Sequence, residues 1–177
     1  MKSKALGTVA LVFALCGWAC TASAEQIQVG FSPEGTAQAL VLQVIDKAQS
    51  QIRLMGYSFT SPPIVMALIA AHKRGVDVQI VLDAEGNQAK ASLAAMNLIA
   101  SAGIPLRTNG AYKIMHDKVL ITDGQNVETG SFNYTASAAK ANSENAMVLW
   151  GNPGLAQVYL THWQSRWNQG QDYRPGY

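Results

Sequence analysis

Cysteine is nearly absent from this sequence of 177 residues, and the two that occur, Cys16 and Cys20, lie close to the N-terminus. Both fall within residues 1–24, which have the pattern of a secretory signal peptide. The remaining chain, 25–177, has no cysteine, which excludes thiol chemistry and leaves its stability to an apolar core. Hydrophobic residues make up 49% of the sequence, enough for one well-buried domain.

The N-terminal segment contains the three parts of a signal peptide. Lys2 and Lys4 precede an apolar stretch, and small residues follow it up to Ala24. We expect cleavage after Ala22 or Ala24, a single domain over 25–177, and a periplasmic or secreted protein. The apolar stretch is short for a membrane span and no second one follows, so no stable membrane anchor is expected.

An excess of one charge is also missing. The sequence has 13 lysines and arginines against 11 aspartates and glutamates, and the signal segment holds two of the lysines and no acid. The exported chain is therefore formally neutral, and a polyanion has to be held by a local cluster of cations. Arg107 and Lys113 are the best candidates for contacts to a nucleic-acid backbone.

What is present from Gln26 onward is an alternation of short β-branched runs with longer segments of helical periodicity. This alternation predicts an α/β domain in which a layered, mixed β-sheet is flanked by helices. In the last expected helix, Trp163 and Trp167 are interpreted as packing residues. The expected strands are 27–31, 52–59, 76–82, 104–107, 112–115, 118–122, 127–130 and 145–150, and the expected helices are 36–49, 61–74, 87–101, 133–140 and 153–167.

His116 and Lys118 are the pair of residues that most strongly indicates chemistry. Residues two apart on an extended strand point to the same face, which would place an imidazole beside an ammonium. A neutral imidazole nitrogen can attack phosphorus, and the ammonium can offset the charge of the non-bridging oxygens. The pair therefore predicts a phosphodiester site, whereas His116 alone would also fit a hydrogen-bonded structural residue.

Further residues are candidates for the same site. Ser131 and Asn133 follow a strand and precede a helix, where backbone N–H groups and short polar side chains converge on anions; helix capping is their alternative role. Asp123 ends the strand that starts at Lys118, and could orient a neighbour or cap a turn. Glu144 could fix the tautomer of His116 by a hydrogen bond, or be a solvated loop residue.

Taken together, these residues resemble the phospholipase D superfamily. The pattern is H-x-K-x-x-x-x-D at 116–123, followed by G-S-x-N at 130–133 and an acidic residue at Glu144. The motif lies in the second half of the chain in the order strand, loop and helix, as it does in that family. The size and the single motif are similar to the small exported bacterial endonuclease of the superfamily, which implies a phospholipase D-like fold.

The resemblance implies a mechanism as well. Members of this family build one active site from two copies of the motif, and neither His72 nor His162 begins a second H-x-K here. A homodimer is therefore expected, with one His116 forming a phosphohistidine while His116 of the partner subunit protonates the leaving oxygen. No metal or cofactor is expected. The expected catalytic residues are His116, Lys118, Asp123 and Glu144, and the expected phosphate ligands are Lys118, Ser131 and Asn133.

The expected function is a nonspecific endonuclease of DNA, with RNA as a second substrate. A phospholipase D-type hydrolase of phospholipid head groups and a non-catalytic phosphate-binding module are the alternatives. A serine nucleophile is disfavoured because no G-x-S-x-G is present. A metal-dependent hydrolase is disfavoured because H-x-x-x-H and H-x-x-E spacings are missing and Lys118 would repel the cation; its ligands would be His116, Asp117, Asp123 and His162.

Overall fold

The computed structural model describes residues 26–175, so the expected signal peptide lies outside the described residues. Its eight strands form one sheet in the order β1-β7-β6-β5-β2-β3-β4-β8. The strands are β1 (Gln26–Ser32), β2 (Gln51–Gly56), β3 (Asp77–Asp83), β4 (Leu106–Asn109), β5 (Lys118–Thr122), β6 (Asn126–Gly130), β7 (Glu144–Trp150) and β8 (Gln171–Asp172). The helices are α1 (Thr36–Lys47), α2 (Pro62–Lys73), α3 (Lys90–Ser101), α4 (Ala136–Lys140) and α5 (Pro153–Gln169).

The sheet is mixed, as the sequence predicts. β2, β3 and β4 are parallel neighbours joined through α2 and α3, whereas β5, β6 and β7 are antiparallel neighbours. β5 also pairs antiparallel with β2, which joins the two halves, and Gly56 at the end of β2 lies opposite Lys118 at the start of β5. The predicted class, a layered mixed sheet flanked by helices, is confirmed.

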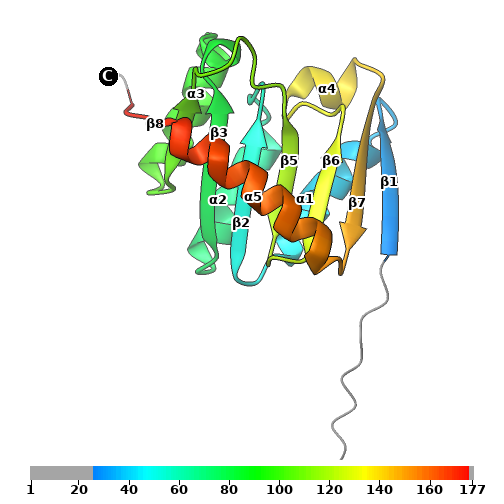
Figure 1. The fold of residues 1–177 in the computed structure, drawn as a ribbon. Helices are drawn as coiled ribbons and strands as arrows, with labels where there is room; N and C mark the ends of the chain where they lie inside the picture. The colour runs from blue at the N-terminus through cyan, green and yellow to red at the C-terminus, as the bar shows by residue number, and fades with distance from the viewer. Residues whose placement is uncertain (1–25, 176–177) are drawn as a thin grey trace, which may run out of the picture.

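Helices cover the sheet unequally (Figure 1). α1, α2 and α3 lie behind the sheet in this view, and α5 crosses its front face diagonally. The larger apolar core lies between the sheet and the helices behind it, and a second core lies under α5. Within residues 26–175, no helix combines the length and the apolar character that a membrane span requires.

Trp163 fixes α5 to the sheet. Its ring is 2% exposed, its Nε1 donates a hydrogen bond to the carbonyl oxygen of Leu54 at 2.9 Å, and it stacks on Trp167 with ring centroids 5.1 Å apart. A buried indole whose N–H is satisfied contributes packing without the cost of an unpaired donor. The interpretation of Trp163 as a packing residue agrees with this geometry.

Residues 112–115 form a loop rather than the expected strand. The backbone N–H of Met115 donates to the carboxylate of Asp83 at 2.6 Å, so this donor goes to a side chain instead of a neighbouring strand. The helices α3 and α4 also begin three residues later than expected. α3 begins at Lys90 after a 3-10 turn at Glu85–Asn87, and α4 begins after Thr135, whose hydroxyl caps it by accepting from Ala138 N at 3.1 Å.

Candidate active site

One end of the sheet brings most of the predicted site residues together. β5 begins there, and because β6 and β7 are antiparallel, the end of β6 and the start of β7 lie at that same end. Five of the six predicted residues line one pocket with Gly130, and they are His116, Lys118, Ser131, Asn133 and Glu144. These five residues, which are spread over 116–144 in the sequence, thus lie together in the structure.

Lys118 is the first residue of β5 and is only 6% exposed. Its Nζ donates to the carbonyl oxygen of His116 at 3.0 Å and lies 5.3 Å from the centroid of the Tyr57 ring. Desolvation lowers the pKa of Lys118, and the negative charges of Glu144 and Asp117 oppose that shift. An ammonium desolvated in this way interacts strongly with an anion that enters the pocket.

His116 lies two residues before the start of β5 and is held by its neighbours. Its ring packs edge-to-face with the ring of Tyr57, with centroids 4.8 Å apart and an interplanar angle of 61°. The next residue, Asp117, accepts a hydrogen bond from the Tyr57 backbone N–H at 2.9 Å, and its carboxylate lies 3.1 Å from Nε2 of His162 on α5. The segment 116–118 is therefore fixed both by the end of β2 and by α5.

The loop after β6 closes tightly on the start of β7. The backbone N–H groups of Ser131 and Phe132 both donate to the carbonyl oxygen of Asn145 at 3.1 Å, and the Ser131 hydroxyl accepts from Asn145 N at 3.0 Å. A Cβ at Gly130 would lie 2.3 Å from that same carbonyl oxygen, so only glycine fits this approach. Asn133 follows in the same loop and lines the pocket, and its Oδ1 is buried with no hydrogen-bond partner among the described residues.

Glu144 lines the pocket, but it does not make the expected contact. One of its carboxylate oxygens accepts from the side-chain amide of Asn142 at 3.0 Å. Within the part of the chain that the structure describes, no hydrogen bond joins Glu144 to His116. Its negative charge instead acts on Lys118, where it opposes the lowering of the lysine pKa by desolvation.

Asp123 is not part of the pocket, and its expected catalytic role is corrected here. It lies at the opposite end of β5, where its carboxylate accepts from the backbone N–H groups of Gln49, Ser50 and Gln51 at 2.8–3.1 Å and from the Ser50 hydroxyl at 2.9 Å. Desolvation would raise its pKa, but these hydrogen bonds outweigh it and hold the pKa below the usual value. Asp123 therefore joins the β5–β6 turn to the α1–β2 loop.

The two predicted contacts to a nucleic-acid backbone have different surroundings. Arg107 is already engaged, because it forms an ion pair with Asp172 at 2.7 Å, donates to the Trp167 carbonyl at 3.0 Å and lies 4.5 Å from the centroid of the Trp167 ring. The guanidinium of Arg107 is thus not free to contact a phosphate. Lys113, by contrast, is exposed in the loop that leads to His116.

The metal-dependent alternative is not supported by the arrangement of its ligands. Asp117 and His162 do lie together, but Asp123 is at the far end of β5. Within residues 26–175, no group of three or more histidine, cysteine, aspartate or glutamate side chains is placed to hold a metal ion. Asp117 and His162 instead form a polar contact that joins the segment 116–118 to α5.

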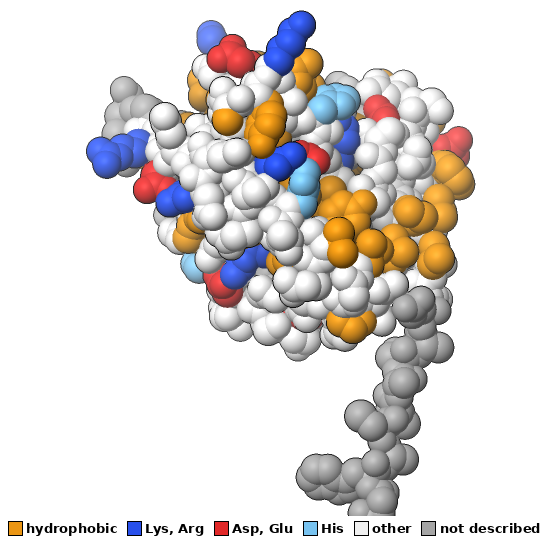
Figure 2. All heavy atoms as spheres, in the orientation of Figure 1, with side chains coloured by type: hydrophobic (Ala, Val, Ile, Leu, Met, Phe, Trp, Pro, Cys, Tyr) orange, Lys and Arg blue, Asp and Glu red, His pale blue; other side chains and the backbone are white. Residues whose placement is uncertain are grey.

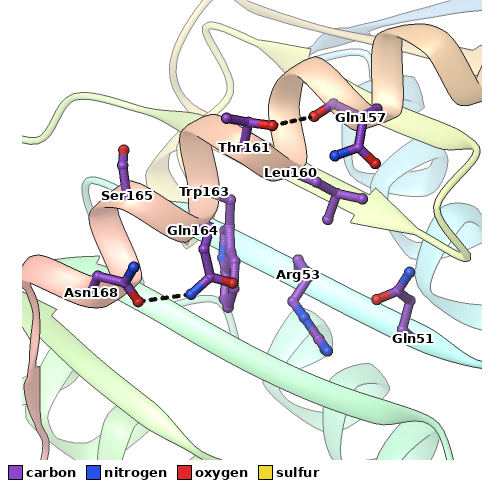
Figure 3. A pocket seen from close by; sticks show the side chains of 9 residues that line it. All are labelled: Gln51, Arg53, Gln157, Leu160, Thr161, Trp163, Gln164, Ser165 and Asn168. Atoms are coloured by element: carbon purple, nitrogen blue, oxygen red, sulfur yellow. Dashed lines mark hydrogen bonds between the residues drawn. The ribbon is translucent and has the colours of Figure 1, made fainter.

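A wider hollow lies elsewhere, between α5 and β2 (Figure 3). Arg53 and Trp163 face it, and Arg53 is engaged there, forming an ion pair with Asp77 and lying 5.4 Å from the Trp163 ring centroid. None of its lining residues is a histidine or a carboxylate, so it offers no acid, base or strong nucleophile. The residues that line it are Gln51, Arg53, Gln157, Leu160, Thr161, Trp163, Gln164, Ser165 and Asn168.

Two features near the site could not be found from the motif. Tyr57 reaches His116 and Lys118 only because β2 pairs with β5. Beneath the loop after β6, the Tyr134 hydroxyl donates at 2.9 Å to Glu128, which is fully buried. Desolvation raises the pKa of Glu128 to about 8, against the opposing effect of that hydrogen bond. A lone glutamate and tyrosine six residues apart give no signal in the sequence.

The residues gathered in the pocket are those of the motif that resembles the phospholipase D superfamily, and comparison with known proteins confirms the resemblance. The family described as cardiolipin synthase, PLD-like domain, matches residues 41–167, so the chain belongs to this family of phospholipase D-superfamily hydrolases.

Individual relatives agree with this assignment. The crystal structure of Nuc from Salmonella typhimurium, a phospholipase D family member, is 60% identical with a TM-score of 0.85, over 85% of this chain and 99% of that chain. A phospholipase D of Rickettsia conorii is 35% identical over 144 residues, which are 81% of this chain and 70% of the relative. NucT from Helicobacter pylori shares the fold, with 21% identity and a TM-score of 0.76 over 85% of this chain and 100% of that chain.

Proposed function

We propose that the chain is a metal-independent endonuclease that hydrolyses the phosphodiester bonds of DNA, with RNA as a second substrate. The observation that carries the proposal is the gathering of His116, Lys118, Ser131 and Asn133 around one pocket. These side chains supply a nucleophile, a cation and polar groups for the non-bridging oxygens. Lys118 provides positive charge of the kind that metal ions provide in other phosphodiesterases.

The proposed reaction has two steps. A ring nitrogen of His116 attacks phosphorus, the bond from phosphorus to the leaving oxygen breaks, and that oxygen takes a proton from a second histidine. Water then attacks the phosphohistidine, the second histidine accepts a proton from the water, and the P–N bond breaks to release a phosphomonoester. His116 is the one histidine among the residues that line the pocket. We therefore propose that His116 of a second subunit is the acid and base.

An exposed apolar surface supports this homodimer. Ile27, Val29 and Phe31 on the edge strand β1 are 62%, 52% and 54% exposed, on the part of the sheet face that α5 leaves uncovered. Figure 2 shows hydrophobic side chains gathered on that side of the front face. The strand that carries the patch ends next to the pocket, because its last residue, Ser32, pairs with Glu144. Packing of two copies through this patch, related by a two-fold axis, would bring two pockets together.

A second candidate is hydrolysis of phospholipid head groups. It is favoured by the names of similar proteins, the phospholipase D of Rickettsia conorii and a mitochondrial cardiolipin hydrolase of Xenopus tropicalis, which is 29% identical over 140 residues. That match covers 79% of this chain and 64% of the relative. A non-catalytic phosphate-binding module is the third candidate, and any turnover eliminates it.

Incubation of the protein in EDTA with bis(p-nitrophenyl) phosphate, single-stranded DNA, duplex DNA, RNA and phosphatidylcholine vesicles tests the proposal. We expect cleavage of the diester and of nucleic acid, and none by the His116→Asn variant. Loss of activity in EDTA, or full activity of His116→Asn, would overturn it. Cleavage of the vesicles alone would favour the lipid hydrolase.

We also propose that the protein is exported, on the basis of the N-terminal pattern of charge and hydropathy. N-terminal sequencing of protein from the periplasm or medium is expected to begin at Ser23 or Glu25. A chain that keeps Met1 and stays with the cytoplasm would contradict this.

A further inference from the structure

The loop that leads to the catalytic histidine exposes side chains that the proposed reaction does not use. Residues 110–117 connect β4 to β5, and within them Tyr112 and Ile114 are 36% and 50% exposed. Lys113 between them is exposed as well. The loop therefore exposes an aromatic, a cationic and an aliphatic side chain next to a polar pocket. Such a group of exposed side chains indicates a binding surface.

The loop is held in place by buried polar residues. Asn109, which is buried, accepts from Ala111 N at 2.9 Å through its side chain and donates to the Arg166 carbonyl oxygen at 2.8 Å. At the other end, the buried Asp83 accepts from the backbone N–H of Met115. Because both ends are fixed, the loop presents its side chains at little cost in conformational entropy when a ligand binds.

Tyr112 itself is oriented by two residues of α5. Its hydroxyl donates to the side chain of Gln169 at 2.8 Å, and the guanidinium carbon of Arg166 lies 4.8 Å from the centroid of its ring. Nε of Arg166 is buried and has no partner among the described residues. The ring is thus backed by a cation and remains partly exposed, an arrangement on which a nucleic-acid base can stack.

We propose that Tyr112, backed by Arg166 and flanked by Lys113, is a subsite for an unpaired nucleotide next to the scissile phosphate, with the base on the Tyr112 ring and a phosphate on Lys113. Tyr112 is four positions before His116, at most about 14 Å of extended chain, so the subsite lies within a few nucleotides of the reacting phosphorus. Bases in a duplex are already stacked and paired, so the subsite selects single-stranded nucleic acid. The inference rests on the proposed nuclease function.

The surroundings of Tyr112 favour a nucleic acid over a lipid surface. A side chain that inserts into a bilayer presents its apolar part outward, whereas this ring is tied through its hydroxyl to Gln169 and lies against the charged Arg166. The adjacent Lys113 offers a sequence-independent contact to a phosphate backbone. Both properties suit a flexible polyanion with planar bases.

The test compares KM for a single-stranded oligonucleotide with KM for bis(p-nitrophenyl) phosphate, which has no neighbouring base. In Tyr112→Ala, the ratio of the oligonucleotide KM to the diester KM should rise about tenfold, as expected from the loss of one base stacked on an aromatic ring. Tyr112→Phe keeps the ring and should restore the ratio to within about twofold of the wild-type value. Lys113→Ala should reduce the slope of log KM against log salt by about 0.7, whereas the exposed Lys90→Ala on α3 should not change it.

The outcomes separate this inference from the proposed function. If the wild type cleaves both substrates but Tyr112→Ala leaves the KM ratio unchanged, the subsite is wrong and the nuclease function stands. If the wild type cleaves neither, the proposed function itself fails. A Tyr112→Ala variant that loses activity on phosphatidylcholine vesicles and keeps it on the oligonucleotide would show that the loop contacts lipid, and would overturn the subsite.

Discussion

Two carboxylates, Asp123 just after β5 and Glu128 on β6, show how the surroundings of a residue decide its role. Asp123 receives hydrogen bonds from the backbone of three successive residues, so its charged form is stabilised. Glu128 is fully buried with Tyr134 as its partner, so its neutral form is favoured. The motif in the sequence includes Asp123, yet along a strand its distance from Lys118 is about 16 Å, too far to share one phosphate with it.

Asp123→Asn tests the structural role of this carboxylate. Asparagine tolerates the left-handed backbone of residue 123, where φ is 54°, so the substitution removes mainly the charge. We expect the free energy of unfolding at neutral pH to fall by about 1–2 kcal/mol, with kcat on a small diester within about twofold of wild type. Because the folded-state pKa is depressed, this stabilisation is present above the unfolded pKa and is lost as pH falls through the folded one. Denaturant titrations at several pH values measure it.

A large loss of kcat in Asp123→Asn without a change in stability would contradict this role. It would restore Asp123 to the catalytic residues.

Glu128→Gln tests the buried acid. The pKa of Glu128 rises from 4.5 in a solvated chain to about 8 in the fold. A raised folded-state pKa gives a stabilisation that is complete below the unfolded pKa and is lost as pH rises through the folded one. The wild type should therefore lose on the order of 4 kcal/mol between about pH 5 and pH 9 through this group, and the glutamine variant should not.

Urea unfolding of the wild type and of Glu128→Gln, between about pH 5 and pH 9, measures this loss of stability. We expect Glu128→Gln to be the more stable protein at the alkaline end, and parallel curves for the two would refute the assignment.

At the scale of elements, the sequence predicted what depends on neighbours along the chain. The strands of the core and the long helices follow from local periodicity, and five pocket residues follow from a motif that spans only 116–144. Features that depend on distant pairing could not be predicted. Tyr57 reaches the site through the pairing of β2 with β5, and 112–115 is a loop because Asp83 takes a backbone donor from it.

α5 is the element that completes the front face, and Trp163 is its main contact. Trp163→Ala removes a buried ring and leaves the Leu54 carbonyl without its donor. We expect this change to lower the free energy of unfolding by about 3–5 kcal/mol. The exposed neighbour Gln164→Ala is the matched control and should change it by less than about 0.5 kcal/mol. Equal effects of the two, measured by urea denaturation, would mean that α5 does not stabilise the sheet in the way described.

At the scale of the whole molecule, the proposed homodimer would cover the apolar patch on β1. Val29→Lys places a charge within the proposed interface, so we expect a monomer that has lost activity, because burying an unpaired charge is costly. Met66→Lys is the control, since Met66 is 60% exposed on α2 behind the sheet. It should remain dimeric and active. Analytical ultracentrifugation with a diester assay measures both properties, and an active Val29→Lys monomer would show that the site is not shared.

The central claim is that one reactive site uses His116 from two subunits, and mixing of subunits tests it most directly. Wild-type and His116→Asn chains are unfolded together in known proportions and refolded, so that they form dimers at random. If both histidines serve one site, activity falls as the square of the wild-type fraction, to about a quarter in an equal mixture. If each chain carries its own complete site, activity falls in proportion to that fraction, to about half, and the account of a shared site is contradicted.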